Sequence, residues 1–184
     1  GASAEPNIAF YRQLTSEAMA EGPGGSGPEL VVWPHNSYER VIRFEAGDPG
    51  LERPGLAGES LGERLKKDVP FPAHVLLSAP AESPQTTPEP WPSKHYVTVL
   101  KGPDGAPVGS TAKVHPTPLA EKMPFGDWFP ILHQLAPKLK RVVPGESRLL
   151  VMADGRKLGV FICYDAVKTG TARLLAAAGA QVLI

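Results

Sequence analysis

The sequence has a single cysteine among its 184 residues, at position 163. One cysteine cannot form an internal disulfide, so the fold must be held by its core rather than by a disulfide framework. The charges also lack a dominant sign, because 19 basic residues balance 19 acidic ones. Without a basic excess the chain has no electrostatic footprint for nucleic acid, and we expect no nucleic-acid partner.

Long apolar runs are missing as well. No stretch approaches the roughly 20 apolar residues that a membrane-spanning helix needs, so the chain itself is expected to be soluble. Residues 1–6 have neither the basic start nor the apolar core of a secretory signal. Proline and glycine, in contrast, are abundant, at 21 and 19 residues, which predicts long irregular connections between elements.

The apolar patterns alternate between helices and strands. Helical spacing predicts helices over 7–21, 56–67, 131–139 and 171–178. Short apolar runs predict strands over 30–33, 74–78, 96–100, 108–114, 148–153, 157–164 and 181–184. The proline-rich segment 79–93 is expected to be a surface loop. This order predicts one α/β or mixed α+β domain with two sheets over residues 1–184. The last predicted strand stops on three apolar residues, so we expect the domain to be incomplete at its ends.

Cys163 comes directly after the apolar run Leu158–Ile162, which predicts a strand buried on both faces. A reactive group at the end of such a strand lies where α/β proteins usually place their chemistry. A free cysteine is also often a small apolar residue of the core. This strand alone leaves the two interpretations open.

Three segments carry ionisable groups just past a predicted strand. They are 31–39 with His35, 113–121 with Lys113 and Glu121, and 161–165 with Cys163. Because strand ends converge on one edge of a parallel or mixed sheet, we expect the three segments to meet in space.

Together these segments resemble motifs of the nitrilase, or carbon–nitrogen hydrolase, superfamily, most closely its apolipoprotein N-acyltransferase branch. That branch has Trp-Pro-Glu and Ile-Cys-Tyr-Glu strand ends and a Lys-x-His-x-x-Pro-Phe-Gly-Glu loop. The matching residues here are Trp33-Pro34-His35, Ile162-Cys163-Tyr164-Asp165 and Lys113 to Glu121, with His115, Pro118, Leu119 and Ala120 between them. The order and spacing of several motifs make the resemblance specific, and it runs from about residue 7 to the end.

The resemblance implies a four-layer αββα sandwich and a catalytic triad of glutamate, lysine and cysteine. Cys163 would be the nucleophile, and the positive charge of Lys113 would favour its thiolate and the oxyanion that forms on attack. Glu121 matches the family's second glutamate, which helps to position the lysine and the acyl group. The resemblance implies no cofactor and no metal.

His35 stands where the family has its general-base glutamate. A histidine also accepts a proton near neutral pH, so His35 is one candidate for the base. Otherwise the site is impaired, or the chain binds its ligand without turning it over. Glu39 lies four residues further on and approaches the site only if this segment turns helically.

The resemblance implies acyl transfer from a phospholipid to the N-terminal amine of an apolipoprotein. The domain would work on the periplasmic side of a bacterial inner membrane, with membrane contact through segments outside this chain. Two alternatives stay open: a soluble nitrilase-type amidase that hydrolyses a C–N bond, and a pseudoenzyme or binding module on the same fold.

Overall fold

The structure is a computed structural model that describes residues 4–21, 27–43, 61–82, 94–126, 128–129, 131–132 and 142–184. Residues 56–60 and 133–139 of two expected helices lie outside the described residues. So do residues 83–93 of the expected proline-rich loop.

Four helical segments are described. They are α1 (Ala4–Ala20), α2 (Leu61–Asp68), the 3-10 helix η2 (Cys163–Val167) and α4 (Thr169–Ala177). The helices expected near the two ends of the chain are confirmed. Gly179 follows α4 with a φ of +96°, a conformation that suits glycine and ends the helix as expected. No helix within the described ranges is long and apolar enough to cross a membrane.

The strands form two sheets. The larger sheet contains β1 (Leu30–Val32), β2 (Ile42–Arg43), β3 (His74–Glu82), β4 (Lys94–Lys101) and β5 (Pro107–Ala112). Its order is β1-β3-β4-β5, with β2 also paired to β3. The smaller sheet has the order β6-β7-β8 and contains β6 (Leu150–Val151), β7 (Lys157–Gly159) and β8 (Val182–Leu183). Both expected hairpins, β4–β5 and β6–β7, are antiparallel pairs.

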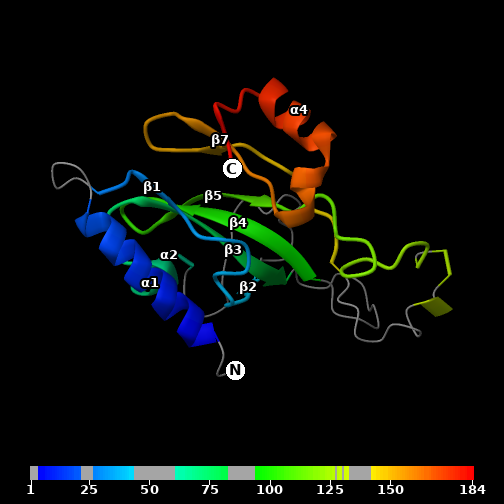
Figure 1. Cartoon of the computed structure of the whole chain (residues 1–184), viewed down its shortest axis with the longest axis horizontal. Helices are drawn as coiled ribbons and strands as arrows, with labels where there is room; N and C mark the ends of the chain where they lie inside the picture. Colours follow the sequence, from blue (N-terminus) through cyan, green and yellow to red (C-terminus); the bar gives the residue numbers. More distant parts are fainter. Residues whose placement is uncertain are drawn as a thin grey trace.

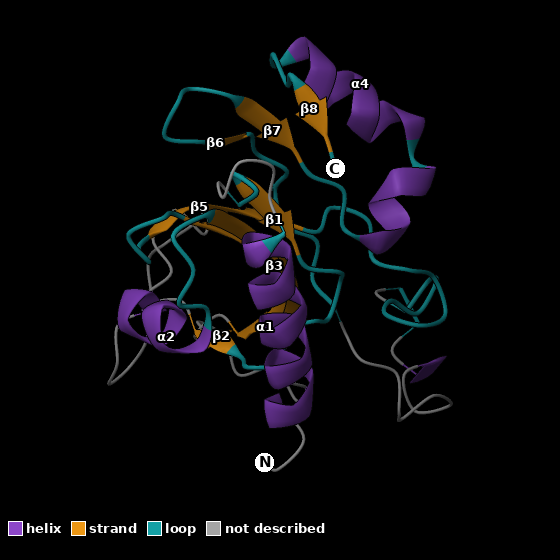
Figure 2. Ribbon diagram, turned by 60° about the vertical axis from the view of Figure 1, so that its left-hand side comes forward, coloured by secondary structure: helices purple, strands orange, loops and turns teal. Residues whose placement is uncertain are grey.

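These elements stack in four layers, which confirms the expected αββα architecture. Helices α1 and α2 lie on one side of the larger sheet, and the smaller sheet and then α4 lie on the other (Figure 1). Figure 2 shows α4 on the far side of the molecule from α1 and α2.

Strand β3 fills the core on both of its faces. Val75 and Leu77 are fully buried in the cluster that the larger sheet makes with α1 and α2. Leu76 points the other way, into the cluster between the two sheets, where it joins Leu100 and Leu158. Successive side chains of a strand face opposite sides, so one apolar run supplies two cores.

Two strand boundaries differ from the expectation by four or more residues. Strand β3 continues to Glu82 instead of ending at Ser78, because antiparallel pairing with β4 keeps residues 79–82 in the sheet. The run that leads to Cys163 is a strand only as far as Gly159, because its register pairs with β6 and β8 end there. Beyond Gly159, the Phe161 N–H still donates to the Ile184 carbonyl at 2.8 Å.

Candidate active site

Cys163 lies at the first position of η2, four residues past the end of β7. Its side chain is exposed, so the interpretation of this cysteine as a core residue is wrong. Its φ is 55°, in the left-handed region that costs a residue with a side chain about 1–2 kcal/mol. An exposed thiol on a strained turn is an arrangement that surrounding contacts must hold in place.

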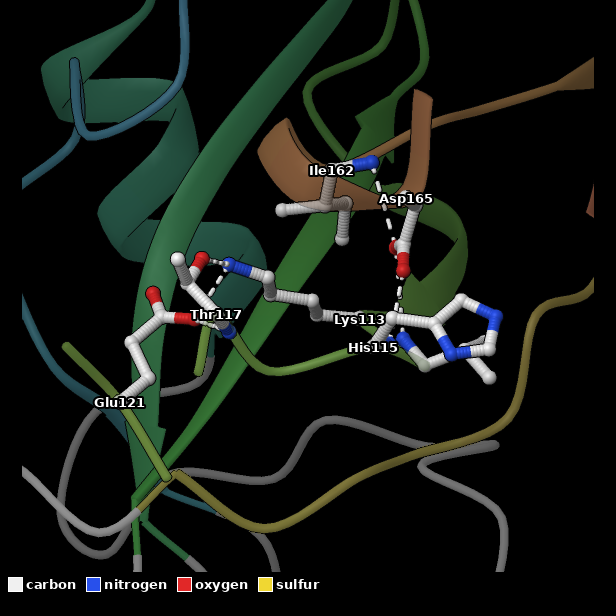
Figure 3. Close-up of polar contacts among 7 residues, drawn as sticks. Lys113, His115, Thr117, Glu121, Ile162 and Asp165 are labelled. Carbon is white, nitrogen blue, oxygen red and sulfur yellow. Dashed lines mark hydrogen bonds and ion pairs between the residues drawn. The ribbon is translucent and has the colours of Figure 1, made fainter. Parts of the chain in front are cut away.

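The Asp165 carboxylate supplies such contacts. It is only 2% exposed and accepts hydrogen bonds from the backbone N–H groups of His115 at 2.7 Å and Val114 at 3.3 Å. It also accepts one from Ile162 at 3.4 Å (Figure 3). Asp165 therefore joins the Cys163 turn to the residues that directly follow Lys113. Two of the three predicted segments, 113–121 and 161–165, thus meet. The sequence had indicated Asp165 only as the residue that replaces the glutamate of the family's Ile-Cys-Tyr-Glu motif.

Lys113 and Glu121 form a close ion pair. Lys113 follows the end of β5, and its ammonium donates to Glu121 Oε2 at 2.5 Å (Figure 3). The Lys113 side chain is 0% exposed and that of Glu121 14%, so the pair is largely removed from water. The attraction between two buried charges offsets the free-energy cost of their desolvation only when the geometry is good and further hydrogen bonds are present. Thr117 provides one, from its backbone N–H to Glu121 Oε2 at 2.7 Å.

The electrostatics keep this carboxylate ionised. Burial by itself would raise the pKa of Glu121. Hydrogen bonds from Lys113 and from the Thr117 backbone, with the charge of Lys113, outweigh burial and hold the pKa below its usual value. At neutral pH the site therefore contains one ammonium and one carboxylate in direct contact.

His35 lies in the turn after β1, and its ring packs edge-to-face on Tyr96 with 5.1 Å between the ring centroids. The Lys113 ammonium is 5.8 Å from the Tyr96 centroid. Burial and the Lys113 charge lower the pKa of His35, against the opposing effect of Glu121. The imidazole is therefore neutral at neutral pH. The shared contacts with Tyr96 place His35, and with it the third predicted segment, near Lys113.

Tyr96 is a residue that the sequence did not single out. Burial raises the pKa of its phenol, and the charges of Glu121 and Cys163 raise it further. Its backbone carbonyl accepts the N–H of Lys113 at 2.9 Å. In the sequence, the only feature that could have pointed to Tyr96 was its position at the start of the predicted strand 96–100.

Glu39 does not take part. Residues 37–39 are not helical, and the Glu39 carboxylate instead accepts a hydrogen bond from Asn7 of α1 at 2.5 Å. The helical approach of Glu39 to the site is therefore wrong. Within the described part of the chain, no group of three or more His, Cys, Asp or Glu residues could hold a metal ion.

No model of a known protein family matches the chain. A curated relative, the apolipoprotein N-acyltransferase of Geobacter metallireducens, is 23% identical over 192 residues. The match covers 98% of this chain, which spans 31%, about a third, of that protein's length.

Solved structures with a similar fold cover nearly the whole chain. A carbon–nitrogen hydrolase from Helicobacter pylori superposes with a TM-score of 0.61 at 18% identity, covering 99% of this chain and 55% of its own. A nitrilase-superfamily member from Saccharomyces cerevisiae gives 0.62 at 19% identity, covering 96% and 56%. A mutant amidase from Nesterenkonia sp., with the acetamide moiety of fluoroacetamide on its active-site cysteine, gives 0.57 at 19% identity, covering 98% and 58%.

Proposed function

Because the chain has the fold of the nitrilase superfamily, as its motifs predicted, we propose that it forms a thioester at Cys163 and passes the acyl group to an amine. The observation that carries this proposal is the set of hydrogen bonds that the buried Asp165 carboxylate accepts from Val114 and His115. It ties the exposed, strained Cys163 turn to the loop of the buried Lys113–Glu121 pair. A nucleophile, a cation and a carboxylate on one rigid frame are the parts that acyl transfer needs.

The reaction has two balanced halves. The Cys163 thiolate attacks the carbonyl carbon of a phospholipid ester, an S–C bond forms, and an oxyanion develops near Lys113. Collapse breaks the C–O bond to glycerol, and the leaving alkoxide takes a proton from water, which replaces the proton that the thiol released to solvent when the thiolate formed. An acceptor amine then attacks the thioester, a C–N bond forms, the C–S bond breaks and the thiolate returns. Glu121 takes the proton that the amine releases.

Support for a lipid donor comes from an exposed apolar segment that includes the end of the Lys113–Glu121 loop and continues beyond it. We call this the 119–131 segment; the large apolar residues that are exposed in its described part are Leu119 (71%), Phe125 (67%), Trp128 (78%), Phe129 (57%) and Ile131 (64%). Several large apolar side chains exposed along one short segment indicate an interaction surface, and aromatic residues suit a lipid interface. The name of the curated relative supplies an apolipoprotein amine as the acceptor. Such a reaction belongs at the periplasmic face of a bacterial inner membrane.

A nitrilase-type amidase is the second candidate. The similar fold of an amidase that carries an acetamide adduct on its cysteine favours it. Here water would take the place of the acceptor amine, and the same thioester would be hydrolysed. A chain that binds without turnover is the third possibility, because His35 stands at the position of the family's glutamate.

Intact-mass measurement after incubation with phosphatidylethanolamine vesicles tests the proposal. We expect one added acyl mass on the wild-type chain, mapped to Cys163, and none on Cys163→Ala. An adduct formed only from small amides supports hydrolysis instead. A chain that gains no mass from either reagent contradicts both enzymatic functions.

A further inference from the structure

The two ring nitrogens of His35 lie in different surroundings. Nδ1 is buried and has no hydrogen-bond partner among the described residues. The side chain as a whole is only half-buried. Because Nδ1 is enclosed, Nε2 is the ring nitrogen that remains for contact with a bound substrate, and the role of His35 depends on whether Nε2 carries the proton.

The surroundings favour a proton on Nε2. A neutral imidazole has one N–H and one bare nitrogen. Buried N–H groups without an acceptor are rarer in proteins than buried acceptors that go unused, which favours the lone pair at Nδ1. The charge of Lys113 disfavours a second proton on the ring. The neutral ring then presents a donor at Nε2, and the nitrogen that a base would need is out of a substrate's reach.

We propose that His35 donates a hydrogen bond from Nε2 to the carbonyl oxygen of the bound acyl group, in place of acting as the general base, and that Tyr96 is the residue that positions its ring. This inference rests on the proposed thioester chemistry. When Cys163 attacks, the carbonyl oxygen becomes an oxyanion that His35 and Lys113 both stabilise. When the C–O bond breaks, the electron pair returns to the carbonyl. His35 keeps its proton throughout.

Tyr96 is suited to the positioning role by two contacts. Its ring meets His35 edge-to-face at 5.1 Å, and its carbonyl accepts the Lys113 N–H at 2.9 Å. Edge-to-face pairs prefer a defined geometry, so the Tyr96 ring limits the orientation of the imidazole. One residue thereby sets the relative places of His35 and Lys113.

Substitutions at His35 separate a donor from a base. We expect the p-nitrophenolate burst from p-nitrophenyl butyrate to slow about tenfold in His35→Gln, which keeps an N–H. His35→Ala and His35→Glu should slow it about 10²-fold or more, the usual cost of a lost oxyanion donor. A base at this position gives the reverse order, with glutamate the fastest of the three variants, and that order overturns the inference.

Two further comparisons complete the test. Tyr96→Leu should slow the burst more than Tyr96→Phe, because phenylalanine keeps the ring that contacts His35. Equal losses in the two variants contradict the positioning role.

His95→Gln is the matched control for His35→Gln. His95 is a half-buried neighbour on the opposite face of β4, also with an unpartnered Nδ1, and its substitution should leave the burst unchanged.

Alkylation by iodoacetamide distinguishes the two levels of failure, because it needs the Cys163 thiolate but no oxyanion donor. We expect all His35 variants to be alkylated at comparable rates. If the wild-type chain shows neither a burst nor alkylation at Cys163, the proposed function fails together with the inference. If the wild type reacts and His35→Glu outpaces His35→Gln, only the inference fails.

Discussion

At the scale of single residues, strained backbone conformations gather at the candidate site. Within the described ranges, the non-glycine residues with positive φ are Asn36 (63°), Leu119 (64°), Phe125 (60°) and Cys163 (55°). Asn36 follows His35, and Leu119 lies inside the Lys113–Glu121 loop. Each such conformation costs on the order of 1–3 kcal/mol and persists only where neighbouring contacts outweigh it. The hydrogen bonds of Asp165 are one such set of contacts.

Removal of the Asp165 carboxylate should loosen this frame. We expect Asp165→Ala to lower the free energy of unfolding by about 2 kcal/mol, because it leaves the part-buried N–H groups of Val114 and His115 without an acceptor. Urea denaturation measures the loss. Asp154→Ala is the control, since Asp154 also accepts a backbone N–H but in an exposed turn. A loss at Asp165 no larger than at Asp154 contradicts this role.

The state of His35 predicts a pH dependence of stability. Its pKa is lower in the folded chain, so the unfolded chain binds the proton more strongly and stability falls as the pH drops below about 6.5, the unperturbed value. Glu121 and His95, whose pKa values are also lowered, add to the loss at acid pH. We expect His35→Gln to lose less stability between pH 7 and 5 than the wild type, measured by urea midpoints. Parallel curves for the two proteins would count against a neutral, buried His35.

At the scale of elements, the segment 142–149 holds the end of β5 from outside the sheet. The Gly145 N–H donates to the Lys113 carbonyl at 2.7 Å, and the Ala112 N–H donates to the Glu146 carbonyl at 3.0 Å. A Cβ on Gly145 would lie 2.3 Å from the Cβ of Ala112. Because Gly145 has no Cβ, its backbone can lie directly against Ala112 at the end of β5. This contact, with the hydrogen bond to the Lys113 carbonyl, fixes the backbone that carries Lys113.

Gly145→Ala should therefore push the segment away from β5. We expect a loss of about 1–3 kcal/mol in unfolding free energy, the usual cost of overpacking, and slower acylation of Cys163. Gly170→Ala is the matched substitution, because a Cβ there meets no atom within 4 Å and Gly170 lies in α4. It should stabilise the chain by up to about 1 kcal/mol. Thermal or urea unfolding of both variants checks the contrast.

At the scale of the whole molecule, the layers bring the chain that follows β5 together with η2, where Asp165 accepts the N–H groups of Val114 and His115. The Lys113–Glu121 loop leads from this junction into the exposed 119–131 segment. Under the proposed function, a donor embedded in a lipid surface contacts that segment. A short-chain donor in solution has no need of it.

This difference predicts a substrate-dependent effect of Trp128→Ser. We expect acyl transfer from phosphatidylethanolamine vesicles to fall about tenfold, since each 1.4 kcal/mol of lost binding is worth that factor. The burst with p-nitrophenyl butyrate should fall much less. Equal losses with both donors would indicate that Trp128 supports the fold of the site and makes no contribution at a lipid surface.

The sequence by itself determined the helices near the two ends, both hairpins and the layered α/β class. Alternation of period 2, helical periodicity and turn residues are local signals, and they were sufficient there. The motif spacing also predicted that Lys113 and Glu121 belong together, and the ion pair at 2.5 Å places them in contact. The catalytic roles of Cys163, Lys113, His35 and Glu121 stay predictions.

Tertiary structure decided the rest. Strand β3 reaches Glu82 because β4 lies beside it, and Cys163 lies exposed at the start of η2 rather than inside a buried strand. The placement of Tyr96 against His35 and the hydrogen bonds of Asp165 to Val114 and His115 join residues about 50 or more positions apart in sequence. No local pattern encodes such contacts, because they depend on which sheets and helices pack together. Burial and charge, and with them the protonation of His35 and Glu121, follow only from that packing.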